Sequence, residues 1–471
     1  MRKVDVAIIG AGTSGLTARR EVEKVTKNYV VIDPGPYGTT CARVGCMPSK
    51  VLIQVANDFH HRTKFAEQGI LAAEQLRIDD RLVMRHVRKL RDRFVRSVLS
   101  GHEAWKSDHL VAKRAKFISK NQLQVGEETI EAQSIVIATG SRPIIPKTWE
   151  PFKSYLIDTD QFFELETLPK KIGIVGLGVI GIELGQALSR LGVDVTGLTI
   201  GKAIGGLSDP ELQNYTFNQF SKEFPIYDTG ADVVGERNGK LVVKSGDKEF
   251  EFDKVFLTMG RRPNVDEIGL EDIGIELDKK GIPVFDKGTF QIPNSRIFIA
   301  GDVNGERPLL HEAADEGRIV GFNSVRSESQ CFQRREFLAI TFADPNIAVV
   351  GKGFAQLKSE NRDFVTGKVS FEGFGRAIIK LKEVGLMHVY GDKKSGKLLG
   401  AEIFGPDGEH LAHLLSWSMN LGLTAHDVLK LPFYHPVMEE ALRTALRDLA
   451  EQVDKVAPQL EIVRCQDAPV R

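Results

Sequence analysis

Two cysteines near the start of the chain have the clearest capacity for chemistry. The segment TCARVGCMPSK at 40–50 places Cys41 and Cys46 five residues apart, with Gly45 between them. On a regular helix this spacing separates two residues by ~7.5 Å along the axis and turns them to different faces. The Cα atoms of a disulfide must lie within ~7 Å. A redox-active disulfide therefore requires a distorted turn here, which Gly45 permits.

The residues after the second cysteine indicate the start of a helix. Pro48 and Ser49 favour a first helical turn, so Cys46 is expected at a helix N-terminus. The helix dipole stabilises a thiolate at that position. The alternative is a pair of buried, reduced and inert thiols, and the neighbouring Thr40 and Lys50 speak against it.

The cysteine segment follows the first of two glycine-rich motifs, which form a weak internal repeat. The motifs are Gly10-Ala11-Gly12-Thr13-Ser14-Gly15 and Gly176-Leu177-Gly178-Val179-Ile180-Gly181, offset by 166 residues. We expect strands at 4–9 and 172–175 before them, helices from 16 to about 25 and up to about 191 after them, and second strands at 29–32 and 193–198. In both copies, 23 residues separate the first glycine from the residue after the second strand, Asp33 or Thr199.

A glycine motif between a strand and a helix is suited to binding a dinucleotide. Gly10 and Gly176 make the tight turn, while Gly12 and Gly178 let a pyrophosphate approach the backbone at a helix N-terminus. Asp33 is placed to accept hydrogen bonds from ribose hydroxyls. One such motif could be a simple glycine-rich turn. Two copies at matched spacing favour two bound dinucleotides, which suggests a flavin and a nicotinamide.

The rest of the chain suggests how the domains are organised. Both repeats close alike, with IVIATGSRP at 135–143 and VFLTMGRRP at 255–263. A further strand is expected at 297–300, then strand-rich alternation from about 341 and helices from about 409 to 452. We expect an α/β fold with two Rossmann-like domains and a C-terminal α+β domain. The expected borders are 1–150 and 151–270 for the two dinucleotide-binding domains, 271–340 for the remainder of the first, 341–460 for the C-terminal domain and 461–471 for a loose tail.

The overall composition disfavours several other classes of protein. The 471 residues carry 63 Lys+Arg and 63 Asp+Glu, and this zero net charge disfavours a nucleic-acid binder. No stretch approaches the ~20 apolar residues of a membrane span, and the first residues do not resemble a cleavable signal. We therefore expect a cytoplasmic protein without nucleic-acid or membrane partners. The four cysteines are too scattered for a zinc or iron–sulfur site, so we expect no metal.

Two surface patterns have simple interpretations. The stretch 81–96 holds seven Arg or Lys residues and one acid, Asp92. A nucleic-acid or membrane face is conceivable, but a solvated helix is favoured. His410 and His413 lie one helical turn apart without a third metal ligand, which favours a surface face. Cys331 and Cys465 are expected to be unreactive.

The combined pattern resembles the class I pyridine nucleotide–disulfide oxidoreductases, which include dihydrolipoamide dehydrogenase, glutathione reductase and mercuric reductase. The resemblance covers nearly the whole chain. It is carried mainly by the cysteine segment and by His435-Pro436 with Glu440, and is supported by Ala138-Thr139-Gly140, Gly176–Glu183, Ile299-Ala300-Gly301-Asp302 and His311. It implies FAD at the first glycine motif, NAD(P) at the second, and a homodimer in which the C-terminal domain sends a histidine into the partner's site.

The resemblance also implies roles for individual residues. Cys41 matches the interchange thiol that attacks a substrate disulfide, and Cys46 the thiol that forms a charge-transfer complex with the flavin. His435 matches the acid–base group, because a histidine can protonate a leaving thiolate near neutral pH. Glu440 matches the carboxylate that orients this ring. Without Pro436 and Glu440 beside it, His435 would be interpreted as a capping or surface histidine.

The remaining matches concern the cofactors. Lys50 and Glu183 match an ion pair near the reactive edge of the flavin, and Asp302 matches the residue that binds the FAD ribityl chain. The other positions assigned to FAD are Gly10, Gly12, Thr13, Ser14, Gly15, Asp33, Thr40, Ala115, Thr139, Gly140 and Gly301. Those assigned to NAD(P) are Gly176, Gly178, Ile180, Gly181, Thr199 and Gly260.

Several positions depart from the dihydrolipoamide dehydrogenase pattern. Asp33 replaces a Glu, Thr39 a Gly, Arg43 an Asn, and Thr199 the Glu that accepts from the NAD ribose. The sequence thus indicates a divergent member, most similar to dihydrolipoamide dehydrogenase, that passes electrons between NAD(P)(H), FAD, the cysteine pair and a small-molecule or lipoyl-protein substrate. The alternatives are a reductase of another small disulfide, as in glutathione reductase, and a redox-sensing flavoprotein that does not turn over.

Overall fold

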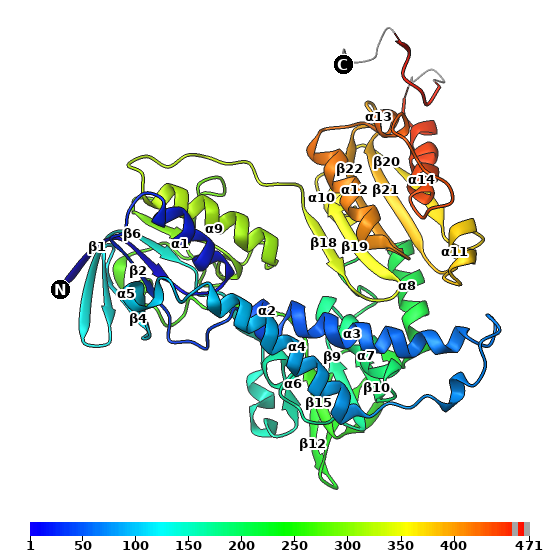
Figure 1. Cartoon of the computed structure of the whole chain (residues 1–471), viewed down its shortest axis with the longest axis horizontal. Coiled ribbons are helices and arrows are strands. Elements are labelled where there is room, and N and C mark those ends of the chain that lie inside the picture. Colours follow the sequence, from blue (N-terminus) through cyan, green and yellow to red (C-terminus); the bar gives the residue numbers. More distant parts are fainter. Residues whose placement is uncertain (455–459, 466–471) are drawn as a thin grey trace.

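The computed structural model describes residues 1–454 and 460–465 of the chain. A mostly parallel sheet in each of the first two units and an antiparallel sheet in the C-terminal part, all three packed with helices, confirm the expected α/β class with an added C-terminal α+β part (Figure 1). The expected loose tail lies partly outside the described residues and stays a prediction there. No helix within the described ranges is long and apolar enough to cross a membrane.

The first sheet is built around the N-terminal strand. Its order is β3-β2-β1-β6-β5-β4, and β17 pairs with β6. β1 runs parallel to β2 and β6, so the glycine motif after β1 lies at the carboxyl edge of the sheet. The strands are β1 (Arg2–Ile9), β2 (Tyr29–Ile32), β3 (Leu110–Val111), β4 (Ala115–Ser119), β5 (Gln122–Val125), β6 (Glu128–Ile137) and β17 (Ile297–Ile299).

The second sheet repeats this core with fewer strands. Its order is β11-β10-β9-β15-β8, with all strands parallel. A separate antiparallel sheet, β12-β13-β14, is formed by the segment between β11 and β15. The strands are β8 (Leu156–Ile157), β9 (Lys171–Val175), β10 (Asp194–Leu198), β11 (Ile226–Tyr227), β12 (Asp232–Arg237), β13 (Lys240–Ser245), β14 (Lys248–Phe252) and β15 (Lys254–Leu257).

The closing motifs of the two repeats pair with each other. β7 (Ser141–Pro143) and β16 (Arg261–Pro263) form a two-stranded antiparallel sheet in which Arg142 lies opposite Arg262. The two Gly-x-Arg-Pro segments therefore join the two dinucleotide-binding units, a relation that their similarity alone did not predict.

The C-terminal part is an antiparallel sheet of order β18-β19-β22-β21-β20 covered by helices (Figure 1). Its strands are β18 (Leu338–Thr341), β19 (Asn346–Gly351), β20 (Phe364–Ser370), β21 (Leu386–Asp392) and β22 (Leu398–Gly405). Its helices are α10 (Phe354–Ser359), α11 (Gly375–Ile379), α12 (Gly408–Asn420), α13 (Ala425–Leu429) and α14 (Glu440–Glu451).

The remaining helices belong to the first two units, where α3 packs against α7 and α4 packs against α3. They are α1 (Thr13–Glu23), α2 (Thr40–Val44), α3 (Cys46–His61), α4 (Asp80–Ser100), α5 (Lys106–His109), α6 (Thr159–Phe162), α7 (Val179–Arg190), α8 (Pro210–Glu223) and α9 (Leu310–Ser324). The helix expected from residue 16 starts at Thr13 instead, directly after Gly12, which brings the helix N-terminus into the glycine motif itself.

Two glycines allow α9 to pack directly on the backbone of α1. A Cβ atom at Gly317 would lie 2.4 Å from the Ser14 carbonyl oxygen, and one at Gly321 would lie 2.5 Å from that of Ala18. Backbone cannot move aside as a flexible side chain can, so this contact accepts no larger residue. The packing holds the helix after the first glycine motif against the first sheet.

We expect Gly317→Ala to destabilise the protein by about 1–3 kcal/mol, the usual effect of overpacking a close contact. The higher helix propensity of alanine offsets only part of this. Gly375→Ala is the matched control, since a Cβ atom there meets nothing within 4 Å. Denaturant unfolding of both variants checks the prediction, and equal midpoints would contradict it.

Candidate active site

A break between two helices brings the cysteines together. α2 ends at Val44, α3 begins at Cys46, and Gly45 between them has φ −126° and ψ −120°. A Cβ atom at Gly45 would lie 3.1 Å from the Thr40 carbonyl oxygen. The turn is therefore distorted at the glycine, as the spacing required. Both cysteines are free thiols in this structure, so the disulfide itself stays a prediction.

The two thiols form an unequal, hydrogen-bonded pair. The hydrogen bond donated by the Cys41 thiol and the positive charge of Lys50, acting against burial, lower the pKa of Cys46 to about 7. The same hydrogen bond, together with burial, raises the pKa of Cys41. Near neutral pH the pair can therefore hold one thiolate at Cys46 and one protonated thiol at Cys41.

An ion pair fixes the helix that begins at Cys46. Lys50, one turn into α3, lies 2.8 Å from the carboxylate of Glu183 on α7. Glu183 is 3% exposed and also accepts a 2.8 Å hydrogen bond from the backbone N–H of Phe342. The ring of Phe342 lies 4.7 Å from the Lys50 Nζ atom. A single carboxylate thus connects the cysteine helix, the second dinucleotide-binding unit and the C-terminal part.

Both glycine motifs have the same packing geometry. A Cβ atom at Gly10 or Gly176 would lie 2.2 or 2.7 Å from a carbonyl oxygen of the neighbouring strand end, so both turns lie against their sheets. At Gly12 and Gly178 a Cβ atom meets nothing within 4 Å, and neither helix has a side-chain cap. Each helix N-terminus therefore offers backbone N–H groups to an anion, as dinucleotide binding requires.

Acidic residues lie beside the first motif. Asp33 follows β2 and accepts 2.6 Å hydrogen bonds from the backbone N–H groups of Ala11 and Gly35. Asp302 follows β17 and accepts a 2.8 Å hydrogen bond from the Ser141 hydroxyl. The polar groups of the first motif thus include two carboxylates at the carboxyl edge of the sheet.

Two further residues, not among those predicted from the sequence, shape this edge. Arg261 donates to the Ser141 hydroxyl and carbonyl at 2.8 and 2.6 Å, and so supports the group that bonds Asp302. Glu316 accepts 2.7 Å hydrogen bonds from the Gly301 N–H and from Asn304. Arg261 could have been singled out from the matched closing motifs. Glu316 carries no sequence signal, because its partners are defined only by folding.

The other cofactor positions lie on the same strand ends and loops. Thr139 donates a 2.7 Å hydrogen bond to the Asn264 carbonyl, and Gly140 and Gly260 have positive φ. Thr199 follows β10 and is buried. Thr40 is the first residue of α2, Ile180 lies in the first turn of α7, and Ala115 is buried at the start of β4.

The histidine and its carboxylate form a separate pair in the C-terminal part. The His435 Nδ1 atom lies 3.0 Å from the nearer Glu440 oxygen, and the histidine side chain is 81% exposed. The hydrogen bond from this ring and one from the Val437 N–H outweigh burial and lower the pKa of Glu440. The loop before α14 lies away from α2 in the fold (Figure 1), so one chain does not bring His435 to its own cysteines.

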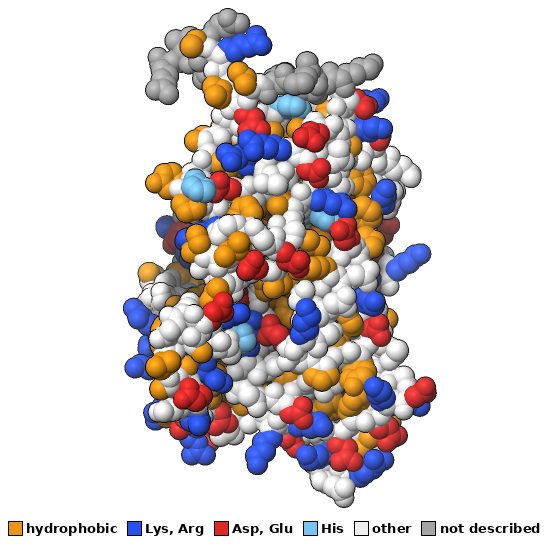
Figure 2. Space-filling view, turned by 90° about the vertical axis from the view of Figure 1, so that its right-hand side faces the viewer, with side chains coloured by type: hydrophobic (Ala, Val, Ile, Leu, Met, Phe, Trp, Pro, Cys, Tyr) orange, Lys and Arg blue, Asp and Glu red, His pale blue; other side chains and the backbone are white. Residues whose placement is uncertain are grey.

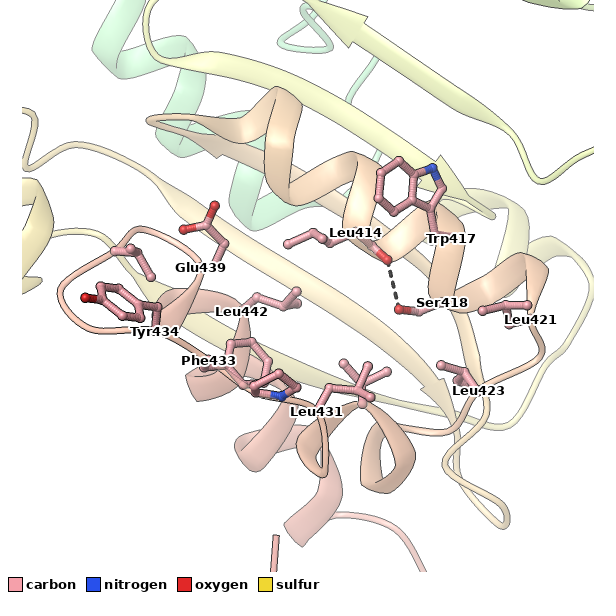
Figure 3. Close-up of a pocket in the computed structure, with 13 residues that line it drawn as sticks. Leu414, Trp417, Ser418, Leu421, Leu423, Leu431, Phe433, Tyr434, Glu439 and Leu442 are labelled. Carbon is pink, nitrogen blue, oxygen red and sulfur yellow. Dashed lines mark hydrogen bonds between the residues drawn. The ribbon is translucent and has the colours of Figure 1, made fainter. Parts of the chain in front are cut away.

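An apolar pocket of about 510 Å³ is lined in part by Tyr434 and Val437, which lie close to this histidine in the chain. It is formed between α12 and the chain that leads from α13 to α14 (Figure 3). Trp417, Leu421 and Tyr434 on its rim are 61%, 75% and 80% exposed. The residues that line it are Leu414, Trp417, Ser418, Leu421, Leu423, Val428, Leu431, Pro432, Phe433, Tyr434, Val437, Glu439 and Leu442.

Comparison with known proteins defines the class. Residues 4–317 match the family model described as pyridine nucleotide-disulphide oxidoreductase, and residues 338–446 match the dimerisation domain of the same family. The chain belongs to the pyridine nucleotide-disulphide oxidoreductases. It is an oxidoreductase with FAD and NAD(P) as cofactors, as the two glycine motifs predicted, and their uncapped helix N-termini fit these groups.

Individual relatives narrow the comparison. The chain is 30% identical to the dihydrolipoyl dehydrogenase of Bacillus subtilis over 93% of its length and 94% of that protein. It is 31% identical to the mitochondrial dihydrolipoyl dehydrogenase of Rattus norvegicus over 94% of this chain and 89% of that protein. The HOCl-induced flavoprotein disulfide reductase RclA of Escherichia coli, solved as a Cu(II) complex, shares the fold with a TM-score of 0.81. Its sequence is 21% identical, and the match covers 96% of this chain and 100% of that one. These identities indicate a divergent member.

We expect two-electron reduction of the holoenzyme to produce long-wavelength charge-transfer absorption that increases with pH through about 7, because the Cys46 thiolate forms in this range. Cys46→Ser should abolish it. Cys41→Ser should show it without any reductant, since Cys46 can then no longer form a disulfide. Absorption spectra from pH 5.5 to 9 measure the effect, and wild-type behaviour in both variants would contradict the assignment.

Proposed function

We propose that this protein is a homodimeric FAD-dependent disulfide oxidoreductase of the dihydrolipoamide dehydrogenase type. The observation that carries the proposal is the unequal thiol pair on α2 and α3, with α3 joined by Lys50–Glu183 to the second dinucleotide-binding unit. FAD and NAD(P), when bound, carry an electron pair to or from this thiol pair. The expected cytoplasmic location and the absence of metal and nucleic-acid partners remain predictions.

The thiol chemistry follows from the two pKa shifts. The raised pKa of Cys41 means that this thiol needs a base, and we assign that role to His435 of the partner subunit. Cys41 attacks one sulfur of the substrate disulfide, the S–S bond breaks, and the leaving thiolate takes the proton held by the histidine. The Cys46 thiolate then attacks Cys41, which closes the protein disulfide and releases the second substrate thiolate. The reverse order oxidises a dithiol.

Two alternatives involve the same residues. A reductase of another small disulfide, as in glutathione reductase, would use the same thiols and differ only in the substrate. A redox-sensing flavoprotein would not turn over. The presence of both thiols, together with the His435–Glu440 pair, supports turnover.

A panel of substrates tests the proposal directly. Lipoamide, glutathione disulfide and a small protein disulfide are each assayed with NADH and NADPH. Turnover highest with lipoamide supports the dihydrolipoamide dehydrogenase type. Turnover highest with glutathione disulfide supports the first alternative, and no turnover with any of the three supports the second.

The surface of the C-terminal part supports a homodimer. Exposed apolar side chains such as Trp417, Leu421 and Tyr434 line the pocket between α12 and the chain that leads to α14 (Figure 3). Large exposed apolar patches mark interaction surfaces. A second copy seated on this face would bury these side chains and bring His435 toward the cysteines of the other chain.

We expect activity to return when two inactive homodimers exchange subunits. In a mixed dimer of one Cys41→Ser chain and one His435→Gln chain, one of the two sites keeps a wild-type cysteine pair and a wild-type histidine. An equal mixture should therefore reach roughly a quarter of wild-type activity at full exchange. Steady-state turnover measures this, with native mass spectrometry to verify exchange. Full exchange without recovery would contradict the arrangement across subunits.

The position of Thr199 bears on coenzyme choice. It follows β10, where a carboxylate would accept from the 2′-hydroxyl of NAD and repel the 2′-phosphate of NADP. A 2′-phosphate is usually bound by arginine, and Lys202 is the cation between Thr199 and Leu207. Lys202 donates to Asn214 at 3.2 Å. Neither coenzyme is therefore strongly selected at this edge.

We expect wild type to prefer NADH modestly, by less than about a hundredfold in kcat/KM, because one charge-assisted hydrogen bond contributes about 1.5–3 kcal/mol. Thr199→Glu should increase the preference, mainly by rejecting NADPH. Kinetics with both coenzymes measure the ratio. A wild type that already excludes NADPH by several orders of magnitude would overturn this expectation, as would an unchanged ratio in the variant.

A further inference from the structure

The outer face of α4 carries a stripe of positive charge. Its inner face, with Val83, Met84 and Val87, packs in one core cluster with Leu52 and Ile53 of α3. At about 100° per residue, the cations on the other side span an arc of about 120° centred opposite these apolar residues. The cations of the stripe, all exposed, are Arg81, Arg85, Lys89, Arg93 and Arg96.

This charge is not neutralised within the described part of the chain. None of the five stripe cations forms an ion pair with a described acid, although ion pairs are frequent elsewhere on the protein. The one acid on the same arc, Asp92, pairs with Arg91 at 2.8 Å. Figure 2 shows a face of the molecule on which charges of both signs are interspersed. A protein of zero net charge thus concentrates unpaired cations on one helix face.

The stripe extends toward the cysteines. It is about 22 Å long, from the helical rise over residues 81–96, and at its C-terminal end the flank of α4 that carries Val95 lies against the loop before α2. There Gly38 lies between the two elements, because a Cβ atom on it would lie 2.8 Å from Val95 of α4 and 3.4 Å from Arg43 of α2. Arg43 is itself two residues from Cys41 and adds a further cation at this end.

We propose that the α4 stripe is a docking surface for an acidic protein that carries the disulfide substrate. The inference rests on the proposed function and specifies the partner's chemistry. Charge complementarity selects an acidic surface, and a partner lying along the stripe delivers a tethered disulfide at the Arg43 end. Attraction of this kind raises association rates about 10–10³-fold and decreases with salt. A nucleic acid matches the charge but carries no disulfide to the cysteines.

Peptides of defined charge test the proposal. One carries a lipoyl-lysine flanked by glutamates, and its partner has glutamines in their place, while free lipoamide serves as a neutral substrate. At low ionic strength we expect wild type to show at least tenfold higher kcat/KM for the glutamate peptide. This advantage should disappear near 0.5 M salt, where screening is effective within several ångströms.

Matched variants locate the effect on the protein. Arg85→Glu/Lys89→Glu should lower kcat/KM for the glutamate peptide about tenfold and leave that for lipoamide within twofold, because lipoamide is uncharged. Lys279→Glu/Lys280→Glu makes the same charge change at exposed positions on the turn after the second dinucleotide-binding unit and should have no effect. Equal effects of the two variants, or equal kcat/KM for both peptides in wild type, would overturn the proposal.

A binding assay separates this proposal from the proposed function. Fluorescence anisotropy of a labelled glutamate peptide reports docking without turnover. The first outcome is salt-sensitive binding that Arg85→Glu/Lys89→Glu weakens, without lipoamide turnover in wild type. This would support the acidic partner and contradict the dihydrolipoamide dehydrogenase type. Lipoamide turnover without such binding would support the dihydrolipoamide dehydrogenase type and contradict the acidic partner. Binding of a labelled DNA duplex that depends on the stripe, with no peptide binding, would assign the surface to nucleic acid instead.

Discussion

The buried carboxylate of Glu183 holds the site together. It pairs with Lys50 on the cysteine helix and accepts from the Phe342 backbone at the entrance to the C-terminal part, while its own helix follows the second glycine motif. Removing Lys50 would leave this carboxylate, 3% exposed, buried without its counter-charge, which destabilises the fold. Cys46 lies one turn from Lys50, so the same lysine both anchors the helix and lowers the pKa of the thiol. Structural support and reactivity are therefore coupled through one side chain.

Pairing of the two repeats gives the dinucleotide-binding units a fixed relation. β7 and β16 join the units through their own closing segments, and Arg261 from the second unit supports Ser141 and hence Asp302 in the first. A repeat of this kind could exist as two independent domains. Here the second unit contributes directly to the polar edge of the first, which keeps two dinucleotide-binding edges and the cysteine turn in one framework.

The C-terminal part carries an ordered imidazole–carboxylate pair, His435 with Glu440. His435 is ordered by Glu440 yet lies in an exposed loop, away from the cysteines of the same chain. The raised pKa of Cys41 calls for such a base. An apolar face and an exposed histidine thus occur together in the part of the chain that matches the family's dimerisation domain.

The sequence by itself determined the features that depend on local order along the chain. The glycine motifs, the distorted cysteine turn and the helix beginning at Cys46 follow from residue type and short spacing, because backbone sterics and helix-terminus electrostatics act over a few residues. Composition and periodicity sufficed for the α/β class. The start of α1 at Thr13 lies before the predicted start at residue 16, because the small residues 13–15 show no helical spacing of apolar side chains.

Only the tertiary structure decided which distant residues meet. The spacing of Gly317 and Gly321 does not indicate that their backbone packs on the backbone of α1. Likewise, no sequence motif around Glu316 predicts its hydrogen bond with Gly301. The pKa values of the two thiols also depend on a lysine, a glutamate and burial that come together only on folding. These contacts join positions far apart in the chain, where no periodic pattern constrains the pairing, so their energies exist only once the core has placed the backbones side by side.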